Sequence, residues 1–287
     1  MFMYNRPRYQ LKCGDRTLTL GERTLIMGIL NVTPDSFSDG GMFLSPEKAL
    51  HQAKRLIEEG ADIIDVGGES TRPFSDSVSE EEEKRRVIPI IEKLAAEVDI
   101  PISIDTCKSG VARRALEAGA TIINDVSALR FDPTMGEVAA ESGAPVILMH
   151  MLGTPKTMQK NPHYDAVIAE IISFLQERIA YATRCGVRRE QIVVDPGIGF
   201  GKTVDHNLSV LKHLAAFHTL NCPLLLGASR KTFIGMILEK EDPLEREIGT
   251  GSVTCAAILA GVHIVRVHNV SHNVEVATMA DAILRAD

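Results

Sequence analysis

Short apolar runs that alternate with helical patterns constrain the fold of this chain more than any other feature. The runs are short enough to be buried strands, and they lie at residues 25–32, 63–66, 102–104, 121–126, 146–149, 192–194, 224–226 and 264–267. Between them, apolar residues three and four positions apart predict helices at residues 46–59, 80–97, 109–118, 166–185, 207–218 and 251–259. Such alternation implies a parallel sheet in an α/β fold. Eight units favour a closed (β/α)8 TIM barrel over an open doubly wound sheet.

Local signals agree with this division of the chain. Ser45 followed by Pro46, and Ser79 with Glu82, are typical of helix starts. Three similar tetrapeptides place a glycine after a helix and before the next strand, at residues 58–61, 117–120 and 141–144. One βα unit therefore recurs along the sequence.

The N-terminal residues 1–23 form an extension to this pattern. Residues 9–23 alternate around Gly14 and Asp15, which predicts a β-hairpin. No Pro- or Ser-rich linker divides residues 1–287, so we expect a single domain.

Composition and charge exclude several classes of protein. Apolar residues make up 45% and charged residues 24% of the chain, which is far from the composition of disorder. A net charge of -7 argues against a general nucleic-acid binder. The five cysteines are scattered and form no CxxC pair, so we expect neither a disulfide framework nor a zinc site. No apolar run reaches the ~20 residues that span a bilayer, and no signal peptide is evident. We therefore expect a cytoplasmic protein.

In a barrel, the residues at the carboxyl ends of the strands face one shared site. Here those strand exits are nearly all polar, and they comprise Asn31, Glu69, Ser70, Thr71, Arg72, Asp105, Thr106, Asn124, Asp125, Met149, His150, Asp195, Pro196, Gly197, Ser229, Arg230, Lys231, Arg266, Val267 and His268. Taken alone, Asp105 or Asp125 is as readily explained as a cap of the next helix. His150 is better explained by packing than by catalysis, and the acidic run 80–83 as a solvated first helical turn.

A glycine-rich segment at residues 197–203 suggests a phosphate-binding P-loop. Its first glycine is one position too close, because position 196 is proline. The glycines are better explained by a tight turn after a strand.

The remaining residues at the strand exits divide by their chemistry into two groups, which we call the two halves of the site. Asp105, Asn124 and Asp195 supply hydrogen-bond acceptors and one amide, which suit a flat heterocycle with amino and ring N–H groups. Lys231 would then serve the carbonyl and nitrogen acceptors of the ring.

The second half is cationic. Arg266 and His268 are two positions apart on one strand and so share a face. With Thr71 and Arg72 they could clamp an anion such as a phosphate.

Two long motifs resemble the signatures of the dihydropteroate synthases: MGILNVTPDSFSDGG at residues 27–41 and DVGGESTRP at residues 65–73. Shorter matches follow at residues 103–106, 123–126, 195–202, 229–231 and 266–268, so the resemblance covers residues 25–270. It implies an enzyme that joins dihydropterin methyl pyrophosphate to p-aminobenzoate in folate synthesis, by a dissociative mechanism in which pyrophosphate leaves. It also implies a homodimer.

The resemblance assigns roles to individual residues. The residues that it implies hold or line the dihydropterin ring are Asp105, Asn124, Asp195, Lys231, Met149 and Phe200. Those that it implies hold the pyrophosphate are Thr71, Arg266 and His268. It makes Asn31 the Mg²⁺ ligand, and with it we expect Lys231, Arg266 and His268 to carry catalysis.

The loops at residues 33–42 and 70–78 correspond to those that close over the site in the family, and Phe37 and Phe74 could supply apolar cover. Three residues depart from the family pattern, namely Phe74 for Gly, Thr232 for Ser and Asn269 for Asp. The last helices carry an apolar series at Val274, Val276, Met279 and Ile283. This series does not identify a dimer interface, because packing on the barrel explains it equally well.

Two alternatives share the pterin-binding barrel. A methyltetrahydrofolate methyltransferase would not need a pyrophosphate clamp, and a non-catalytic homologue would be expected to lose one. Arg266, His268, Asn31 and Thr71 together argue against both.

Overall fold

The computed structural model describes residues 6–32, 46–70 and 77–286. Eight parallel strands form the sheet: β3 (Leu25–Asn31), β4 (Ile63–Gly67), β5 (Ile102–Asp105), β6 (Ile122–Asp125), β7 (Val146–Met149), β8 (Ile192–Asp195), β9 (Leu225–Leu226) and β10 (Ile264–Val267). Their order is β8-β7-β6-β5-β4-β3-β10-β9, and a parallel bridge from Val194 to Leu224 joins the two edges. The predicted barrel and its eight strands are confirmed.

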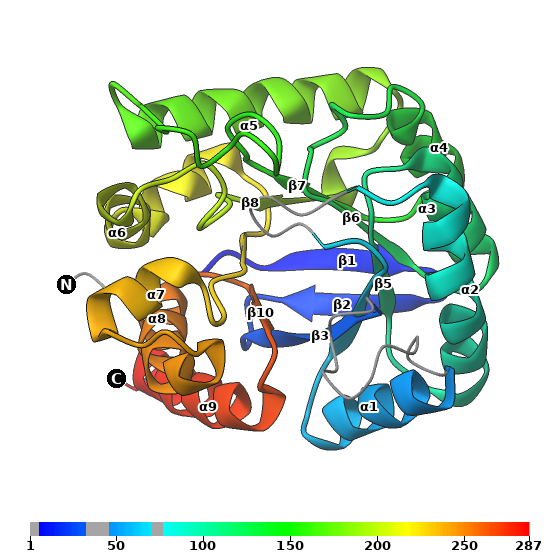
Figure 1. Cartoon of the computed structure of the whole chain (residues 1–287), viewed down its shortest axis with the longest axis horizontal. Helices are drawn as coiled ribbons and strands as arrows, with labels where there is room; N and C mark the ends of the chain where they lie inside the picture. Colours follow the sequence, from blue (N-terminus) through cyan, green and yellow to red (C-terminus); the bar gives the residue numbers. More distant parts are fainter. Residues whose placement is uncertain (1–5, 33–45, 71–76, 287) are drawn as a thin grey trace.

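Helices surround the strands in chain order (Figure 1). They are α1 (Pro46–Glu58), α2 (Glu80–Glu97), α3 (Ser109–Glu117), α4 (Met135–Ser142), α5 (Val167–Arg184), α6 (Val204–Lys212), α7 (Thr232–Leu238), α8 (Glu247–Leu259) and α9 (Val270–Arg285). Aliphatic side chains of strands and helices fill the layer between them, as Val66 and Ile104 do with Leu94. No helix among these described residues is long and apolar enough to cross a membrane.

The helix predicted at residues 207–218 is wrong in its second half. The α-helix α6 ends at Lys212, and a 3-10 helix, η3 (Leu214–Leu220), follows. Helices α4 and α7 were not predicted from periodicity. In α4, Gly136 packs against Cys185, since a Cβ at position 136 would lie 2.7 Å from the Cys185 sulfur. This helix therefore contacts its neighbour through a glycine, and its sequence lacks the apolar stripe by which periodicity identifies a helix.

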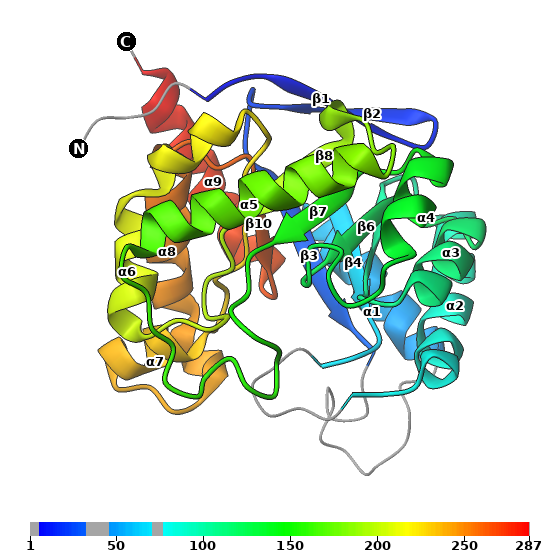
Figure 2. The same ribbon diagram turned by 90° about the horizontal axis from the view of Figure 1, so that it is seen from above.

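The predicted hairpin is confirmed as β1 (Tyr9–Cys13) and β2 (Arg16–Leu20). It lies across one end of the barrel (Figure 2). Leu11, Cys13 and Leu20 pack there against residues near the starts of the strands, including Met27 and Ile122. The hairpin therefore closes the end opposite the strand exits, and only the other end can form a site.

The helix start at Ser79 is confirmed, since its hydroxyl accepts a hydrogen bond from the amide of Glu82 at 3.2 Å. Ser45 lies outside the described residues. The interpretation of residues 80–83 as wholly solvated is wrong for Glu83, which is fully buried and forms an ion pair with Lys108. Glu83 shares the barrel-facing side of α2 with Val87, four residues on, and both pack close to Gly68.

Candidate functional site

Strand pairing aligns several of the predicted residues at one level of the barrel. Asn31 is paired with Gly67, Gly67 with Asp105, and Asp105 with Asn124. Because the strands are parallel, the carboxyl ends of all four strands meet at the same end of the barrel.

A buried ionic network occupies this end. The guanidinium of Arg266 donates from Nε to Asp65 Oδ2 at 2.6 Å and from Nη2 to Asp105 Oδ2 at 2.7 Å. Asn124 donates from Nδ2 to the same Asp65 oxygen at 3.1 Å. The structure thus brings Asp105, Asn124 and Arg266 together, and it adds Asp65, a residue to which we assigned no role from the sequence.

Two carboxylate oxygens of the network have no hydrogen-bond partner among the described residues: Asp65 Oδ1 and Asp105 Oδ1. Burial raises the pKa of Asp105 to about 7, because it outweighs the attraction of Arg266. For Arg266 itself, burial lowers the pKa, but the charges of Asp65 and Asp105 outweigh burial and raise it. An unpaired buried carboxylate oxygen is unfavourable, so the site is suited to a ligand with N–H donors.

Asp195, at the end of β8, and Lys231, just before α7, add a second carboxylate and an ammonium to the site. Asp195 is buried, its Oδ1 accepts from the amide of Gly197 at 2.7 Å, and burial raises its pKa. The ammonium of Lys231 donates to the carbonyl of Ile198 and lies 4.1 Å from the ring centroid of Phe200. Burial lowers the pKa of Lys231 to about 7, against the attraction of Asp195.

An apolar wall borders these polar groups. Val126, Met149, Met151 and Met158 form one buried cluster against which Phe200 packs. The predicted lining residues Met149 and Phe200 therefore lie together, and a flat ring could stack against them.

Ser229, which follows the neighbouring strand β9, holds His268 in place. Ser229 Oγ lies 3.0 Å from His268 Nδ1 and also accepts from the His268 amide at 3.2 Å. The contacts with Ser229 therefore orient the imidazole of His268 at this end of the barrel.

The sequence matches a family and relatives of known activity. The family described as pterin binding enzyme matches residues 27–268. Dihydropteroate synthase from Synechocystis is 50% identical over 275 residues, which cover 96% of this chain and 95% of the relative, and that from Escherichia coli K12 is 51% identical over 263 residues, or 91% and 92%. This chain belongs to the dihydropteroate synthases.

Solved dihydropteroate synthases share the fold closely. The Yersinia pestis enzyme, in a sulfonamide drug complex, has a TM-score of 0.92 and 43% identity, with 96% of this chain and 100% of that chain covered. The Xanthomonas albilineans enzyme in complex with 7,8-dihydropteroate has a TM-score of 0.88 and 43% identity, with 98% and 100% covered. The methyltransferase and non-catalytic alternatives are thereby set aside.

Three polar residues near the site of this dihydropteroate synthase serve the structure. Asp125 accepts from the amides of Ser127 and Leu129 at 2.8 Å each, so it fixes the turn after β6 and does not cap the next helix, α4, which begins only at Met135. His150 is buried, as expected, and its Nδ1 lies 2.9 Å from the ammonium of Lys202.

Lys202 is a structural residue that the sequence did not reveal. Its ammonium also contacts the carbonyls of Gly197 at 2.9 Å and Phe200 at 3.2 Å. Three acceptors match its three donors, so Lys202 fixes the glycine-rich turn; this turn does not form a P-loop.

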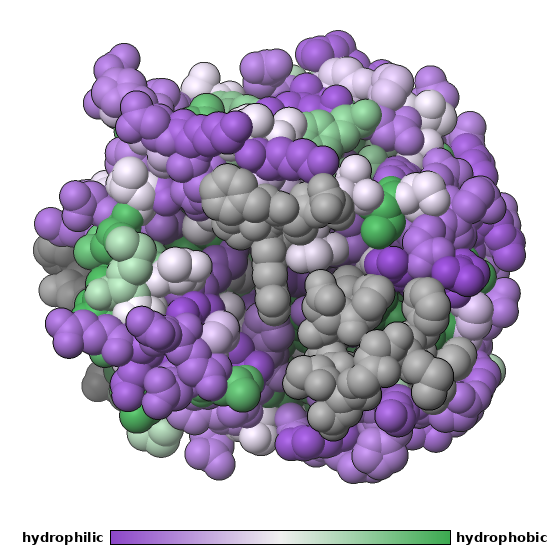
Figure 3. All heavy atoms as spheres, in the orientation of Figure 1, coloured by the Kyte–Doolittle hydropathy of each residue, from purple (hydrophilic) through white to green (hydrophobic). Residues whose placement is uncertain are grey.

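Thr71 and Arg72 lie outside the described residues, as do Phe37, Phe74 and most of the two predicted closing loops. Thr232 begins α7, and Asn269 caps α9 by accepting from the His272 amide at 3.2 Å. Asn269 therefore retains a capping function where the family has Asp. Around the site, the face opposite the hairpin is mainly hydrophilic outside the grey residues (Figure 3), as charged substrates require.

The residues present fit the magnesium ion that the family implies. A Cβ placed on Gly67 would lie 3.7 Å from both Asn31 Oδ1 and Asp105 Oδ2, so both oxygens lie beside a residue without a side chain. Mg²⁺ prefers oxygen ligands, and it often takes only one or two from the protein when phosphates supply more.

Proposed function

We propose that this chain condenses (7,8-dihydropterin-6-yl)methyl diphosphate with p-aminobenzoate to give 7,8-dihydropteroate and pyrophosphate, with the residue roles given below. The observation that carries the proposal is the buried Asp65–Arg266–Asp105 network, which presents, beside a guanidinium, carboxylate oxygens that no described residue pairs. The carboxylates can bind a ring that is rich in N–H donors, and the guanidinium can bind an anion next to that ring.

Asp105, Asn124, Asp195 and Lys231 bind the pterin ring. Ring N–H and amino groups donate to Asp105 and Asp195, which compensates the cost of burying these carboxylates. Lys231 donates to the ring carbonyl and nitrogen acceptors. Met149 and Phe200, which lie in one apolar cluster, contact a face of the ring.

Arg266 and His268, with Thr71 and Arg72, bind the pyrophosphate. The bond between the pterin methylene carbon and the pyrophosphate oxygen breaks first, and both bonding electrons leave with the pyrophosphate. The p-aminobenzoate nitrogen then attacks the pterin methylene cation and loses one proton.

Catalysis by these residues is mainly electrostatic. Arg266 and His268 stabilise the negative charge that develops on the leaving group, and Lys231 holds the ring in place. A strong general base is not required, because the attacking amine is neutral and its proton becomes acidic only after attack.

Asn31 Oδ1 would hold the Mg²⁺ ion that we propose as the metal of this site. When bound, it supplies positive charge that neutralises the pyrophosphate oxygens. The Asp105 oxygen Oδ2 lies beside Gly67, as Asn31 Oδ1 does, so this carboxylate is close to the proposed metal position.

We propose the second substrate and the assembly state by analogy with the family. The Xanthomonas albilineans relative has been solved with 4-aminobenzoic acid, and the Yersinia pestis relative with a sulfonamide; we propose that both kinds of ligand bind this chain at one place. We further propose a cytoplasmic location, which its five free thiols support.

We propose a homodimer formed through the outer faces of α7, α8 and α9. Apolar side chains are exposed there at Met236, Ile237, Leu238, Ile248, Met279 and Ile283, and Leu244 is exposed in the 3-10 helix η4 (Pro243–Arg246) between α7 and α8. Ile248 is 79% exposed, which is unfavourable for so large an apolar side chain unless a second copy covers it.

The decisive experiment measures turnover of dihydropterin methyl pyrophosphate with labelled p-aminobenzoate, with and without Mg²⁺. Metal-dependent formation of dihydropteroate is expected. Arg266→Ala should weaken binding of the pyrophosphate form much more than binding of the bare pterin. Tight pterin binding without any product would overturn the proposed reaction, and equal losses for both ligands would overturn the clamp.

A further inference from the structure

The turn between β9 and α7 has an unfavourable backbone at its centre. Arg230 adopts a left-handed conformation, with φ of +59°. This conformation is costly for a residue with a side chain and persists only where surrounding contacts enforce it. Arg230 lies between Ser229 and Lys231, so whatever enforces its backbone also places these neighbours.

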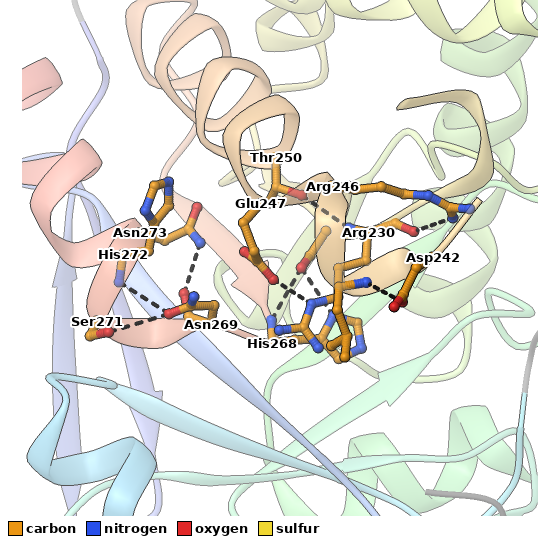
Figure 4. A network of polar contacts seen from close by, with 12 residues as sticks. Arg230, Asp242, Arg246, Glu247, Thr250, His268, Asn269, Ser271, His272 and Asn273 are labelled. Atoms are coloured by element: carbon orange, nitrogen blue, oxygen red, sulfur yellow. Dashed lines mark hydrogen bonds and ion pairs between the residues drawn. The ribbon is translucent and has the colours of Figure 1, made fainter. Parts of the chain in front are cut away.

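Arg246 supplies one of the enforcing contacts (Figure 4). Its Nη1 donates to the carbonyl of Arg230 at 3.0 Å, and its Nε and Nη2 donate to the carbonyls of Lys240 at 3.1 Å and Glu241 at 2.5 Å. The Arg246 side chain is buried. A Cβ on Gly235 of α7 would lie 2.4 Å from Arg246 Nε, so the helix packs directly on the guanidinium.

The start of α8 supplies the other contacts. Thr250, which is 1% exposed, accepts the Arg230 amide at 3.1 Å through its hydroxyl. Glu247 forms an ion pair with the Arg230 guanidinium. The amide, carbonyl and side chain of Arg230 are therefore all fixed by residues 246–250 (Figure 4).

This fixed turn carries two groups of the active site. On one side of Arg230, Ser229 binds both the amide and the ring of His268. On the other side, Lys231 extends over Phe200. A change in the backbone at Arg230 would rotate both side chains away from their partners.

We infer that Arg246 is a positioning residue for Lys231, and through Ser229 for His268, which acts by holding Arg230 in the left-handed conformation. Arg246 makes its contacts to backbone carbonyls of the turn and of residues 240–241. The inference rests on the proposed role of Lys231 in binding the pterin ring.

The test is a double-mutant cycle with Arg246→Met and Lys231→Ala, read out as calorimetric affinity for 6-hydroxymethylpterin. We expect Arg246→Met to weaken binding about tenfold in the wild-type background and less than about twofold in the Lys231→Ala background, because coupled residues give non-additive effects. The matched control is Arg6→Met, which removes another buried guanidinium, paired with Asp281 and located at the hairpin end. It should leave affinity unchanged within about twofold.

A rescue variant separates positioning from general stability. Glycine adopts the left-handed conformation without strain, so Arg230→Gly should restore most of the affinity lost in Arg246→Met. If Arg246→Met does not fold, Thr250→Val removes the contact to the Arg230 amide and enters the same cycle.

Equal losses in both backgrounds, or no rescue by Arg230→Gly, would overturn the inference while the role of Lys231 stands. An unchanged affinity in Lys231→Ala alone would overturn the role of Lys231, and with it the inference.

Discussion

Replacing Asp65 by asparagine tests whether the ionic network holds the barrel mouth together. Asp65 is fully buried, and one of its oxygens accepts hydrogen bonds from both Arg266 and Asn124. Asparagine has nearly the same shape, so Asp65→Asn removes the charge without opening a cavity. The variant leaves the guanidinium with one carboxylate partner in place of two.

The magnitude follows from the contacts that remain. Removing one partner of a buried ion pair costs about 3–5 kcal/mol. Here Arg266 keeps Asp105 at 2.7 Å, and its side chain is 20% exposed, so water offsets part of the loss. A charge-assisted hydrogen bond contributes about 1.5–3 kcal/mol. We therefore expect Asp65→Asn to lower the free energy of unfolding by about 2–3 kcal/mol.

Urea unfolding at neutral pH measures this change, with an unchanged m-value as evidence that the native state is intact. The control is Glu117→Gln, since Glu117 forms an exposed ion pair with Arg114, with side chains 53% and 47% exposed. Exposed pairs contribute little, so this variant should remain within about 0.5 kcal/mol of the wild type. If Asp65→Asn falls in the same range, the buried network does not stabilise the fold and the reasoning is refuted.

Three further changes test the site and its supports. Asp195→Asn should weaken pterin pyrophosphate binding by about 1–3 kcal/mol through loss of charge-assisted hydrogen bonds, and unchanged calorimetric affinity in a folded variant would exclude its role. Burial lowers the pKa of His263 to about 3, so between pH 6.5 and 3 the unfolded chain binds a proton that the folded chain does not. Stability should fall as pH decreases through that window, by up to about 5 kcal/mol relative to His263→Asn, and parallel pH profiles in urea unfolding would contradict this. Asn269→Asp places a negative charge at the start of α9 and should raise stability by about 0.3–1 kcal/mol, which thermal unfolding can measure; a lower melting temperature would argue against the capping role.

The sequence predicted the barrel because its strands are short, apolar and regularly spaced, and because their ends carry polar residues. Asp105, Asn124 and Asp195 could be found from this position alone, since parallel strands bring their carboxyl ends together. The ionic partners could not be found in the same way. Arg266 contacts a carboxylate 201 residues earlier in the chain, and no local pattern encodes such a pair.

Asp65 and Glu83 show why the remaining residues were missed. Asp65 lies between two apolar residues inside β4, where an ionised side chain is rarely buried without a partner that the sequence does not identify. Glu83 belongs to a run of four acidic residues, but only its phase on α2 turns it towards the barrel. In both cases burial depends on three-dimensional packing, whereas residue type suggests exposure.

Asp105 and Lys231 together lead to a prediction about proton exchange on pterin binding. Burial raises the pKa of Asp105 and lowers that of Lys231, each to about 7, so near pH 7 the free site holds both forms of each group. Ring N–H donors favour the ionised form of Asp105, which then releases protons. Ring acceptors favour the charged form of Lys231, which then takes up protons, so the two changes oppose each other in the wild type.

Calorimetry of 6-hydroxymethylpterin binding in buffers with different ionisation enthalpies measures the net number of protons exchanged. We expect the two contributions to offset each other in the wild type at pH 7. Lys231→Met should show a net release of protons relative to the wild type, and Asp105→Asn a net uptake. If the two variants exchange protons in the same direction, the carboxyl and the ammonium do not bind opposite sides of one ring, and the division of the site into donor and acceptor halves is wrong.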